Sequence, residues 1–265
     1  VMCGICIWIN RKGEVEPNTL KEAISLQEQR GPDQTKSMFY NDSFEEVLSG
    51  ENLDKKDNKN IKLGIAHTRL SIIDLSSRSD QPMLSKDNNK LIAFNGEIYN
   101  YVELRDELKN KNGVNFSTEG DTEVLLNWLS INGTKNLSKL NGMWAFAFIN
   151  KVTNEIIFSR DRYGKKPLLY YSDEDNFIAS SDYKSIFHIL NKKRKINEKY
   201  LLAFLMAKTW VNFSSGETFY KDIFNILPGG ELKFDLNKFT FQTNQRNSIN
   251  KYIGKINFNA QDINI

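Results

Sequence analysis

Cysteine and histidine are both scarce in this chain, and their scarcity argues against several kinds of site. The 265 residues include two cysteines, Cys3 and Cys6, and two histidines. Two cysteines three positions apart make a poor staple for a chain of this length, so we expect free thiols in a reducing, cytoplasmic setting. A Cys/His cluster is also missing from the sequence, so we predict no metal site.

Long hydrophobic runs, blocks of one charge and phosphate-binding loops are missing as well. The apolar run CGICIWI, residues 3–9, is far too short to span a bilayer. With 36 basic and 33 acidic residues the net charge is +3, and no basic block indicates nucleic acid or an anionic membrane. No glycine-rich loop lies between a strand pattern and a helix pattern, so we predict no nucleotide and no other cofactor in this chain.

The patterns that are present predict an α+β fold. Hydrophobic residues make up 40% of the chain, enough for a sizeable core. Short strands in the second half are joined by hairpin-type connections, which favours antiparallel sheets with helices packed outside them. The first helix pattern carries Thr19 and Glu22 at the spacing of a capping box. Predicted strands lie at 3–10, 62–74, 91–99, 143–150, 155–161, 167–173 and 177–182, and predicted helices at 19–31, 101–110, 121–132, 183–190 and 198–208.

The residues MCGIC at positions 2–6 place a cysteine where most chains carry little chemistry. If Cys3 becomes the first residue, its α-amino group, with a pKa of about 7.7–8.0, can take the proton of the thiol, whose pKa is about 8.5. The same amine can later protonate a leaving group, so no separate histidine is needed. Gly4 lets a substrate approach the backbone closely. The alternative is a cysteine of the core, which is what we expect of Cys6.

Other positions offer both a structural and a chemical interpretation. Arg69 lies in an apolar strand pattern, where it must pair with an anion, either an internal carboxylate or a substrate carboxylate bound in bidentate fashion. Asn95 and Gly96 are either a hairpin turn or the two donors of an oxyanion hole. Glu97 and Asp121 are either surface or capping residues or ligands of an ammonium group. Together the chemical interpretations describe a pocket for an amino acid with a side-chain amide or ester, and glutamine fits.

Eight motifs that follow one another in a fixed order resemble a known family. They are MCGI, RGPD, AHTRLSIIDLS, FNGEIYNY, GDTEV, LNGMWAFAF, SRDRYGKKPLLYY and LPGG. This order is similar to that in the glutaminase domain of glutamine-hydrolysing asparagine synthetases, which are class II glutamine amidotransferases of the N-terminal nucleophile hydrolase superfamily. The resemblance runs from Met2 to about Leu236. HTRLSIID and NGEIYN favour the synthetase branch over the hexosamine-forming branch.

The resemblance implies a fold, a domain division and residue roles. The fold is a four-layer αββα sandwich of antiparallel sheets, with a glutaminase domain at 1–237 and a linker or the start of a missing synthetase domain at 238–265. ATP and Mg²⁺ are expected only on that synthetase domain. His67 is expected to be a core histidine without a catalytic role. The implied site comprises Cys3 as the nucleophile, Asn95 and Gly96 as the oxyanion hole, Arg69 as the ligand of the α-carboxylate, Glu97 and Asp121 as ligands of the α-amino end, and Leu70 and Ile72 as pocket lining.

The implied activity is hydrolysis of glutamine to glutamate and ammonia through a thioester on Cys3. The ammonia would serve asparagine synthesis, or another ATP-dependent amidation, on a synthetase domain or subunit; a homodimer is left open. One departure is that Val1 precedes Met2, because a Cys3 nitrogen that stays in a peptide bond cannot act as a base. One alternative is a catalytically masked interaction or glutamine-sensing module, in which Val1 and Met2 cover the nucleophile. A second alternative is a related N-terminal nucleophile hydrolase, such as a peptidase or acylase. The chain is expected to be either a fragment or a stand-alone glutaminase.

Overall fold

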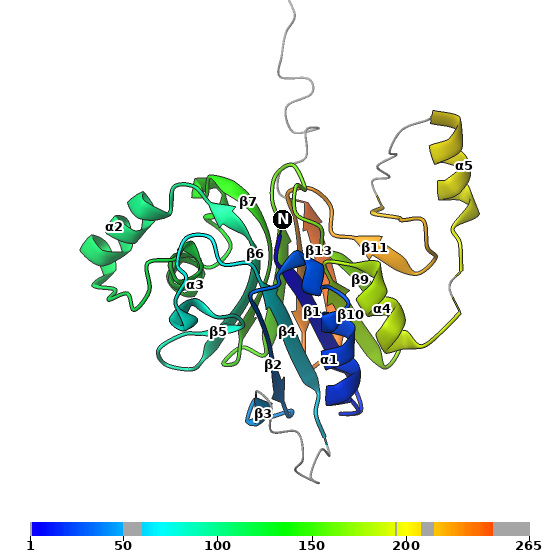
Figure 1. Cartoon of the computed structure of the whole chain (residues 1–265), viewed down its shortest axis with the longest axis horizontal. Helices are drawn as coiled ribbons and strands as arrows, with labels where there is room; N and C mark the ends of the chain where they lie inside the picture. Colours follow the sequence, from blue (N-terminus) through cyan, green and yellow to red (C-terminus); the bar gives the residue numbers. More distant parts are fainter. Residues whose placement is uncertain (1, 50–59, 194, 208–214, 246–265) are drawn as a thin grey trace, which may run out of the picture.

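The computed structural model describes residues 2–49, 60–193, 195–207 and 215–245. Within these residues two antiparallel sheets lie face to face, with helices on their outer sides (Figure 1). The first sheet has the strand order β11-β9-β10-β1-β4-β2-β3, and the second has the order β13-β12-β8-β7-β6-β5. Strands that follow one another in the chain are often neighbours, as the hairpin-type connections in the sequence predict.

The bounds of the elements are as follows. The first sheet contains β1 (Gly4–Asn10), β2 (Gln34–Tyr40), β3 (Glu46–Ser49), β4 (Leu63–Arg69), β9 (Leu169–Ser172), β10 (Asn176–Ser180) and β11 (Ile223–Asn225). The second contains β5 (Met83–Leu84), β6 (Lys90–Ile98), β7 (Gly142–Asn150), β8 (Glu155–Arg160), β12 (Gly230–Asp235) and β13 (Thr240–Gln245). The helices are α1 (Pro17–Ser25), α2 (Tyr101–Asn112), α3 (Asp121–Asn132), α4 (Tyr183–Leu190) and α5 (Glu198–Ala207).

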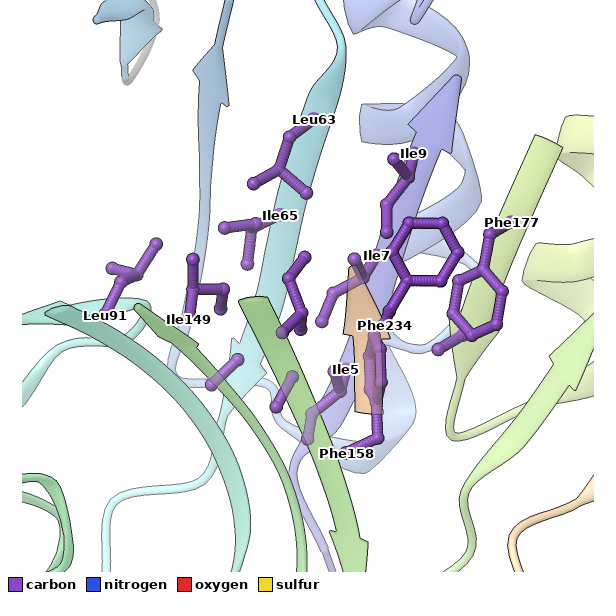
Figure 2. Close-up of a cluster of buried hydrophobic side chains, with 14 of the residues drawn as sticks. Ile5, Ile7, Ile9, Leu63, Ile65, Leu91, Ile149, Phe158, Phe177 and Phe234 are labelled. Atoms are coloured by element: carbon purple, nitrogen blue, oxygen red, sulfur yellow. The ribbon is translucent and has the colours of Figure 1, made fainter. Parts of the chain in front are cut away.

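The strand β1 shows why the layers stack. All seven of its residues are buried, so its sequence is apolar throughout instead of alternating between apolar and polar. Ile5, Ile7 and Ile9 pack in the core between the sheets, whereas Cys6 and Trp8 pack on the opposite face with α1 and α4. Figure 2 shows the three isoleucines beside phenylalanine side chains of β8 and β12. Each fully buried isoleucine stabilises the fold by about 1.5–3 kcal/mol.

The helices complete a sandwich of four layers. A second apolar cluster joins α2 and α3 to the outer face of the second sheet, and a third joins α1 and α4 to the outer face of the first. The order of layers is therefore helices, sheet, sheet, helices, and the predicted αββα sandwich is confirmed. The helix α5 lies apart from these layers (Figure 1). Among the residues that the structure describes, every helix falls short of the length and apolar character that a membrane span requires.

The start of α1 differs from the sequence prediction. The helix begins at Pro17, and the carboxylate of Glu16 accepts the N–H groups of Asn18 and Thr19. Proline suits the first helical position because its fixed φ is helical and its missing N–H would have no partner there. Thr19 therefore lies inside the first turn, and the predicted capping box of Thr19 and Glu22 is wrong.

The second sheet extends past the position where the sequence places a linker. The carboxylate of Asp235 accepts the N–H groups of Asn237 and Lys238, each at 3.0 Å, and closes a tight turn. The chain then returns as β13, which pairs with β12 along its whole length. Residues 246–265 of the predicted linker lie outside the described residues. The division between 237 and 238 thus stays a prediction.

Candidate active site

The eight site residues predicted from the sequence line one pocket, although they come from four separate parts of the chain. Antiparallel pairing of β1 with β4 sets Gly4 opposite Thr68, which brings the start of one strand beside the end of the other. The strand β6 supplies three adjacent residues, and α3 supplies its first residue. The pocket is lined by Cys3, Arg69, Leu70, Ile72, Asn95, Gly96, Glu97 and Asp121, among others. Their roles remain predictions, but their convergence is a fact of the fold.

The Cys3 thiol sits at the pocket wall in a partly buried position. Its sulfur accepts the N–H of Leu70 at 3.4 Å. Burial raises the pKa of this thiol, while the Leu70 N–H and the charges of Lys166 and Arg69 act in the opposite direction. A thiol with a raised pKa is protonated near neutral pH, so a base must take its proton before it can attack. In the chain as printed, the nitrogen of Cys3 is a peptide nitrogen.

Cys6 behaves as the sequence predicts for a core cysteine. It is completely buried beneath α1 and α4, and burial raises the pKa of Cys6 to about 12. A thiol in such surroundings is inert. Cys3, the only other cysteine in the sequence, is therefore the one with access to a substrate.

Asn95 is a buried polar residue of the pocket whose side-chain donor is unpaired among the described residues. The residue is 1% exposed, and its Nδ2 has no hydrogen-bond partner among the described residues. A buried amide donor without a partner costs about 1–3 kcal/mol, so such groups are rare unless a ligand completes them. Because Asn95 lines the pocket that contains Cys3, a substrate oxygen in that pocket is the natural partner.

Gly96 adds a second donor on the same side. The strand β5 pairs with β6 only at Leu91 and Ile92, so this edge of β6 is open farther along. Alternate residues of a strand direct their N–H groups to the same edge. The N–H groups of Phe94 and Ile98 both bond side chains at this edge, and Gly96 lies between them. Its N–H therefore faces the open edge. The alternative of a hairpin turn is wrong, because Asn95 and Gly96 lie inside β6.

Close packing explains why the second donor is glycine. A Cβ atom at Gly96 would overlap the carbonyl oxygen of Met143 and lie 2.8 Å from the Cα of Trp144, both on β7. Any larger residue must push β6 away from β7. The requirement for glycine therefore comes from the sheet, while its N–H serves the pocket.

The sequence left two partners open for Arg69, an internal carboxylate and a substrate carboxylate, and its geometry leaves room for both. Its Nη1 donates to Asp80 at 2.8 Å and to the carbonyl of Ser76 at 3.0 Å, and its Nη2 donates to the carbonyl of Asp74. The internal ion pair is therefore present. These bonds use three of the five N–H groups of a guanidinium, and the other two have no partner within the described part of the chain. The role in binding a substrate carboxylate stays a prediction.

The carboxylate of Asp121, which lines the pocket, is held by a backbone N–H. Asp121 is the first residue of α3, and its Oδ2 accepts the N–H of Ile98 at 2.9 Å. Burial raises the pKa of Asp121 to about 6, and the nearby charge of Glu97 acts in the same direction. Two neighbouring carboxylates in a desolvated pocket repel each other, and an ammonium group between them would relieve that repulsion.

Several pocket residues were missed in the sequence analysis. Gln81 is 4% exposed and lies in the loop before β5, where sequence gives no periodic signal. Lys166 is 6% exposed and lies in the motif SRDRYGKKPLLYY, for which the sequence analysis gave no site residue. A lysine with little exposure beside a thiol is a signal that only the structure can reveal. The other missed lining residues include Asp74, Ser79 and Thr122.

The sequence of this chain is similar to those of known proteins. Residues 2–245 match the family model described as "Glutamine amidotransferase domain". Putative asparagine synthetase [glutamine-hydrolyzing] 2 of Methanocaldococcus jannaschii is 36% identical over 256 residues, which cover 89% of this chain and 45% of that protein. Asparagine synthetase [glutamine-hydrolyzing] 1 of Bacillus subtilis is 36% identical over 177 residues, covering 65% of this chain and 28% of that protein. The chain spans less than half the length of these relatives.

A solved structure supports the fold independently. The glutamine phosphoribosylpyrophosphate amidotransferase of B. subtilis superposes with a TM-score of 0.62 at 19% identity, covering 92% of this chain and 49% of that chain. The antiparallel four-layer sandwich places this molecule in the fold class of N-terminal nucleophile amidotransferases. With the family match, the conclusion is plain: the chain belongs to the glutamine amidotransferase domain family.

Proposed function

We propose that this domain hydrolyses glutamine to glutamate and ammonia through a thioester on Cys3. The observation that supports it most is the buried, unpartnered Nδ2 of Asn95 in the same pocket as the Cys3 thiol. An acyl-transfer site needs a nucleophile and donors aimed at the charge that develops on the carbonyl oxygen. The relatives named above are glutamine-hydrolyzing enzymes by name, which supports glutamine as the acyl donor.

The proposed reaction starts once the α-amino group of Cys3 is free. This amine takes the thiol proton, and the sulfur attacks the side-chain amide carbon of glutamine. Asn95 Nδ2 and the Gly96 N–H stabilise the oxyanion; removing one such donor typically lowers kcat by about 10²–10³. The amine then protonates the departing ammonia, which leaves a γ-glutamyl thioester. With the amine again as base, water attacks the thioester and releases glutamate and the thiol.

The ends of the substrate define its orientation in this proposal. The two unused N–H groups of Arg69 bind the α-carboxylate, and Glu97 and Asp121 bind the α-ammonium. The loop residues Leu70 and Ile72 cover the aliphatic part. Such fixed orientation accounts for a large share of enzymatic rate enhancement, because the reacting atoms are held in place before reaction.

The fate of the ammonia extends the proposal beyond this chain. We propose that it is delivered to an ATP-dependent amide-forming domain or subunit, with asparagine synthesis as the first expectation, because the relatives are named asparagine synthetases and are longer than this chain. ATP and Mg²⁺ are assigned to that partner and not to this pocket. We also propose a cytoplasmic location, which suits two free thiols.

The test is glutamate release from glutamine by protein whose first residue is Cys3. We expect Cys3→Ala to abolish release and the matched change Cys6→Ala, which lies outside the pocket, to retain it. An active Cys3→Ala protein would contradict the thioester. A protein that binds glutamine but releases no glutamate would instead support the sensing module, and Arg69→Ala with unchanged activity would support a different hydrolase of the same superfamily.

A further inference from the structure

Two buried side chains bond the backbone of Phe94, the residue just before the proposed oxyanion hole. Nε2 of His67 lies 3.0 Å from the Phe94 carbonyl oxygen, and Oε1 of Gln81 accepts the Phe94 N–H at 2.6 Å. His67 is 0% exposed and Gln81 is 4% exposed. The backbone N–H and C=O of Phe94, at the open edge of β6, therefore both bond side chains. Neither side chain belongs to a strand of the second sheet.

The contact of His67 crosses from one sheet to the other. His67 is on β4 of the first sheet, and Phe94 is on β6 of the second. A carbonyl oxygen can only accept, so Nε2 carries the hydrogen and Nδ1 does not, as long as the ring is neutral. Burial lowers the pKa of His67 to about 4, which keeps the ring neutral at physiological pH. Nδ1 is buried with no partner in the described part of the chain, so the Phe94 carbonyl is the contact that fixes the ring.

Gln81 links the same edge to α3. Its Nε2 lies 3.4 Å from Oγ1 of Thr122, in the first turn of that helix. Asp121, one residue earlier, accepts the N–H of Ile98. The open edge of β6 is therefore tied down at Phe94 and at Ile98, and the N–H of Gly96 is the donor left between the two attachments.

We propose that His67 and Gln81 are positioning residues that set the direction of the oxyanion-hole donors. This inference rests on the proposed glutamine hydrolysis. The Phe94 carbonyl belongs to the peptide plane that leads into Asn95, so a rotation of that plane moves Asn95 Nδ2 and the Gly96 N–H together. Donors must lie about 2.7–3.1 Å from the oxyanion, and a displacement of about 1 Å can lower the rate about 10²-fold. Neither side chain needs to touch the substrate.

Two pairs of substitutions, one at Gln81 and one at His67, distinguish an effect on the position of the donors from an effect on the stability of the fold. Gln81→Met removes the acceptor for the Phe94 N–H at similar volume, and Gln81→Glu keeps an acceptor oxygen. His67→Phe removes the donor to the Phe94 carbonyl, and His67→Gln keeps an N–H donor. We expect Gln81→Met and His67→Phe to lower kcat about 10–100-fold with KM changed less than about threefold, and the conservative partners to recover most of the loss.

The affinity for a transition-state analogue distinguishes a positioning role from a purely structural role. Glutamate γ-semialdehyde forms a thiohemiacetal with Cys3, whose oxygen occupies the oxyanion hole. Its affinity should fall in Gln81→Met by the same factor as kcat, while the affinity for glutamate, the product, stays the same. Folding is checked by thermal denaturation, and if His67→Phe does not fold, the Gln81 pair carries the test.

The outcomes are distinct. Unchanged kcat in Gln81→Met, or equal losses of affinity for the aldehyde and for glutamate, overturns the positioning role while glutamine hydrolysis stands. A wild-type protein with a free Cys3 amine and no turnover overturns the proposed function and, with it, the inference that rests on it. A parallel loss of kcat and aldehyde affinity, recovered in Gln81→Glu, supports the positioning role.

Discussion

At the scale of residues, the pocket is distinguished by hydrogen-bond donors that have no partner among the described residues. Within the part of the chain that the structure describes, Asn95 Nδ2 is buried and unpaired, and two N–H groups of Arg69 have no partner. The partly buried thiol of Cys3 lines the same pocket. Unsatisfied polar groups are costly in a folded protein, so their presence in one pocket supports the proposal that a polar ligand binds there.

The Asn95 donor yields the first prediction. Asn95→Ala removes one of two oxyanion donors, so kcat for glutamine hydrolysis should fall about 10²–10³-fold, with little change in KM. Steady-state glutamate release measures both constants. Asn141→Ala, a change at an asparagine outside the pocket, is the control and should leave both constants unchanged. A large rise in KM with kcat preserved would assign Asn95 to ground-state binding.

The pKa of Asp121 yields a prediction about pH. Burial raises this pKa to about 6, so the free carboxyl group gains a proton as the pH falls through 6. A neutral Asp121 no longer attracts the α-ammonium of glutamine, and KM should therefore rise below about pH 6. Asp121→Asn should show a raised KM at pH 8 and a flat KM profile across this range. A wild-type KM that is constant from pH 5 to 8 would show that Asp121 does not bind the ammonium.

At the scale of elements, the strand β6 is the central one. Its closed edge against β7 requires glycine at position 96, and its open edge presents donors to the pocket. Gly96→Ala should lower the free energy of unfolding by about 1–3 kcal/mol and abolish activity, because β6 must shift away from β7. Urea denaturation measures the first effect. Gly120→Ala, whose Cβ would lie 3.4 Å from its nearest neighbour, should change stability by less than about 1 kcal/mol.

The loop from Leu70 to Asp80 depends on a partly buried ion pair. Arg69 is 8% and Asp80 21% exposed in their side chains, and their contact holds the guanidinium at the pocket wall. Asp80→Ala leaves that charge free to move, so KM for glutamine should rise about tenfold with a smaller change in kcat. Asp106→Ala, on the surface of α2, serves as the control. Equal kinetics for both variants would mean that the other bonds of Arg69 suffice to hold it.

How far the elements could be predicted depended on their length and on their partners. The long strands β1, β4, β6 and β7 and the helices α2 and α3 have strong apolar patterns, and the sequence located each of them. The strand β2 was missed because QTKSMFY has no regular alternation and its place is decided by pairing with β4. The short strands β3, β5 and β11 have two to four residues and carry no period at all.

At the scale of the whole molecule, the site is a product of topology. Residues 67 positions apart, Cys3 and Leu70, touch only because β1 and β4 pair with their ends aligned. The sequence predicted the chemical types in the pocket, since a nucleophile, donors and charges can be recognised locally. It did not predict that His67 and Gln81 both contact Phe94, because these contacts join the two sheets and the loop before β5. Contacts between residues so far apart in the chain leave no recognisable pattern in the local sequence.

The central claim is that the α-amine of Cys3 is the base that activates its own thiol, and the state of the N-terminus tests it most directly. Intact mass and glutamate release should be measured on two preparations, one that begins at Cys3 and one that retains Met2. We predict glutamate release from the first and none above background from the second, since a peptide nitrogen cannot take the thiol proton. Equal rates from the two preparations would contradict the account.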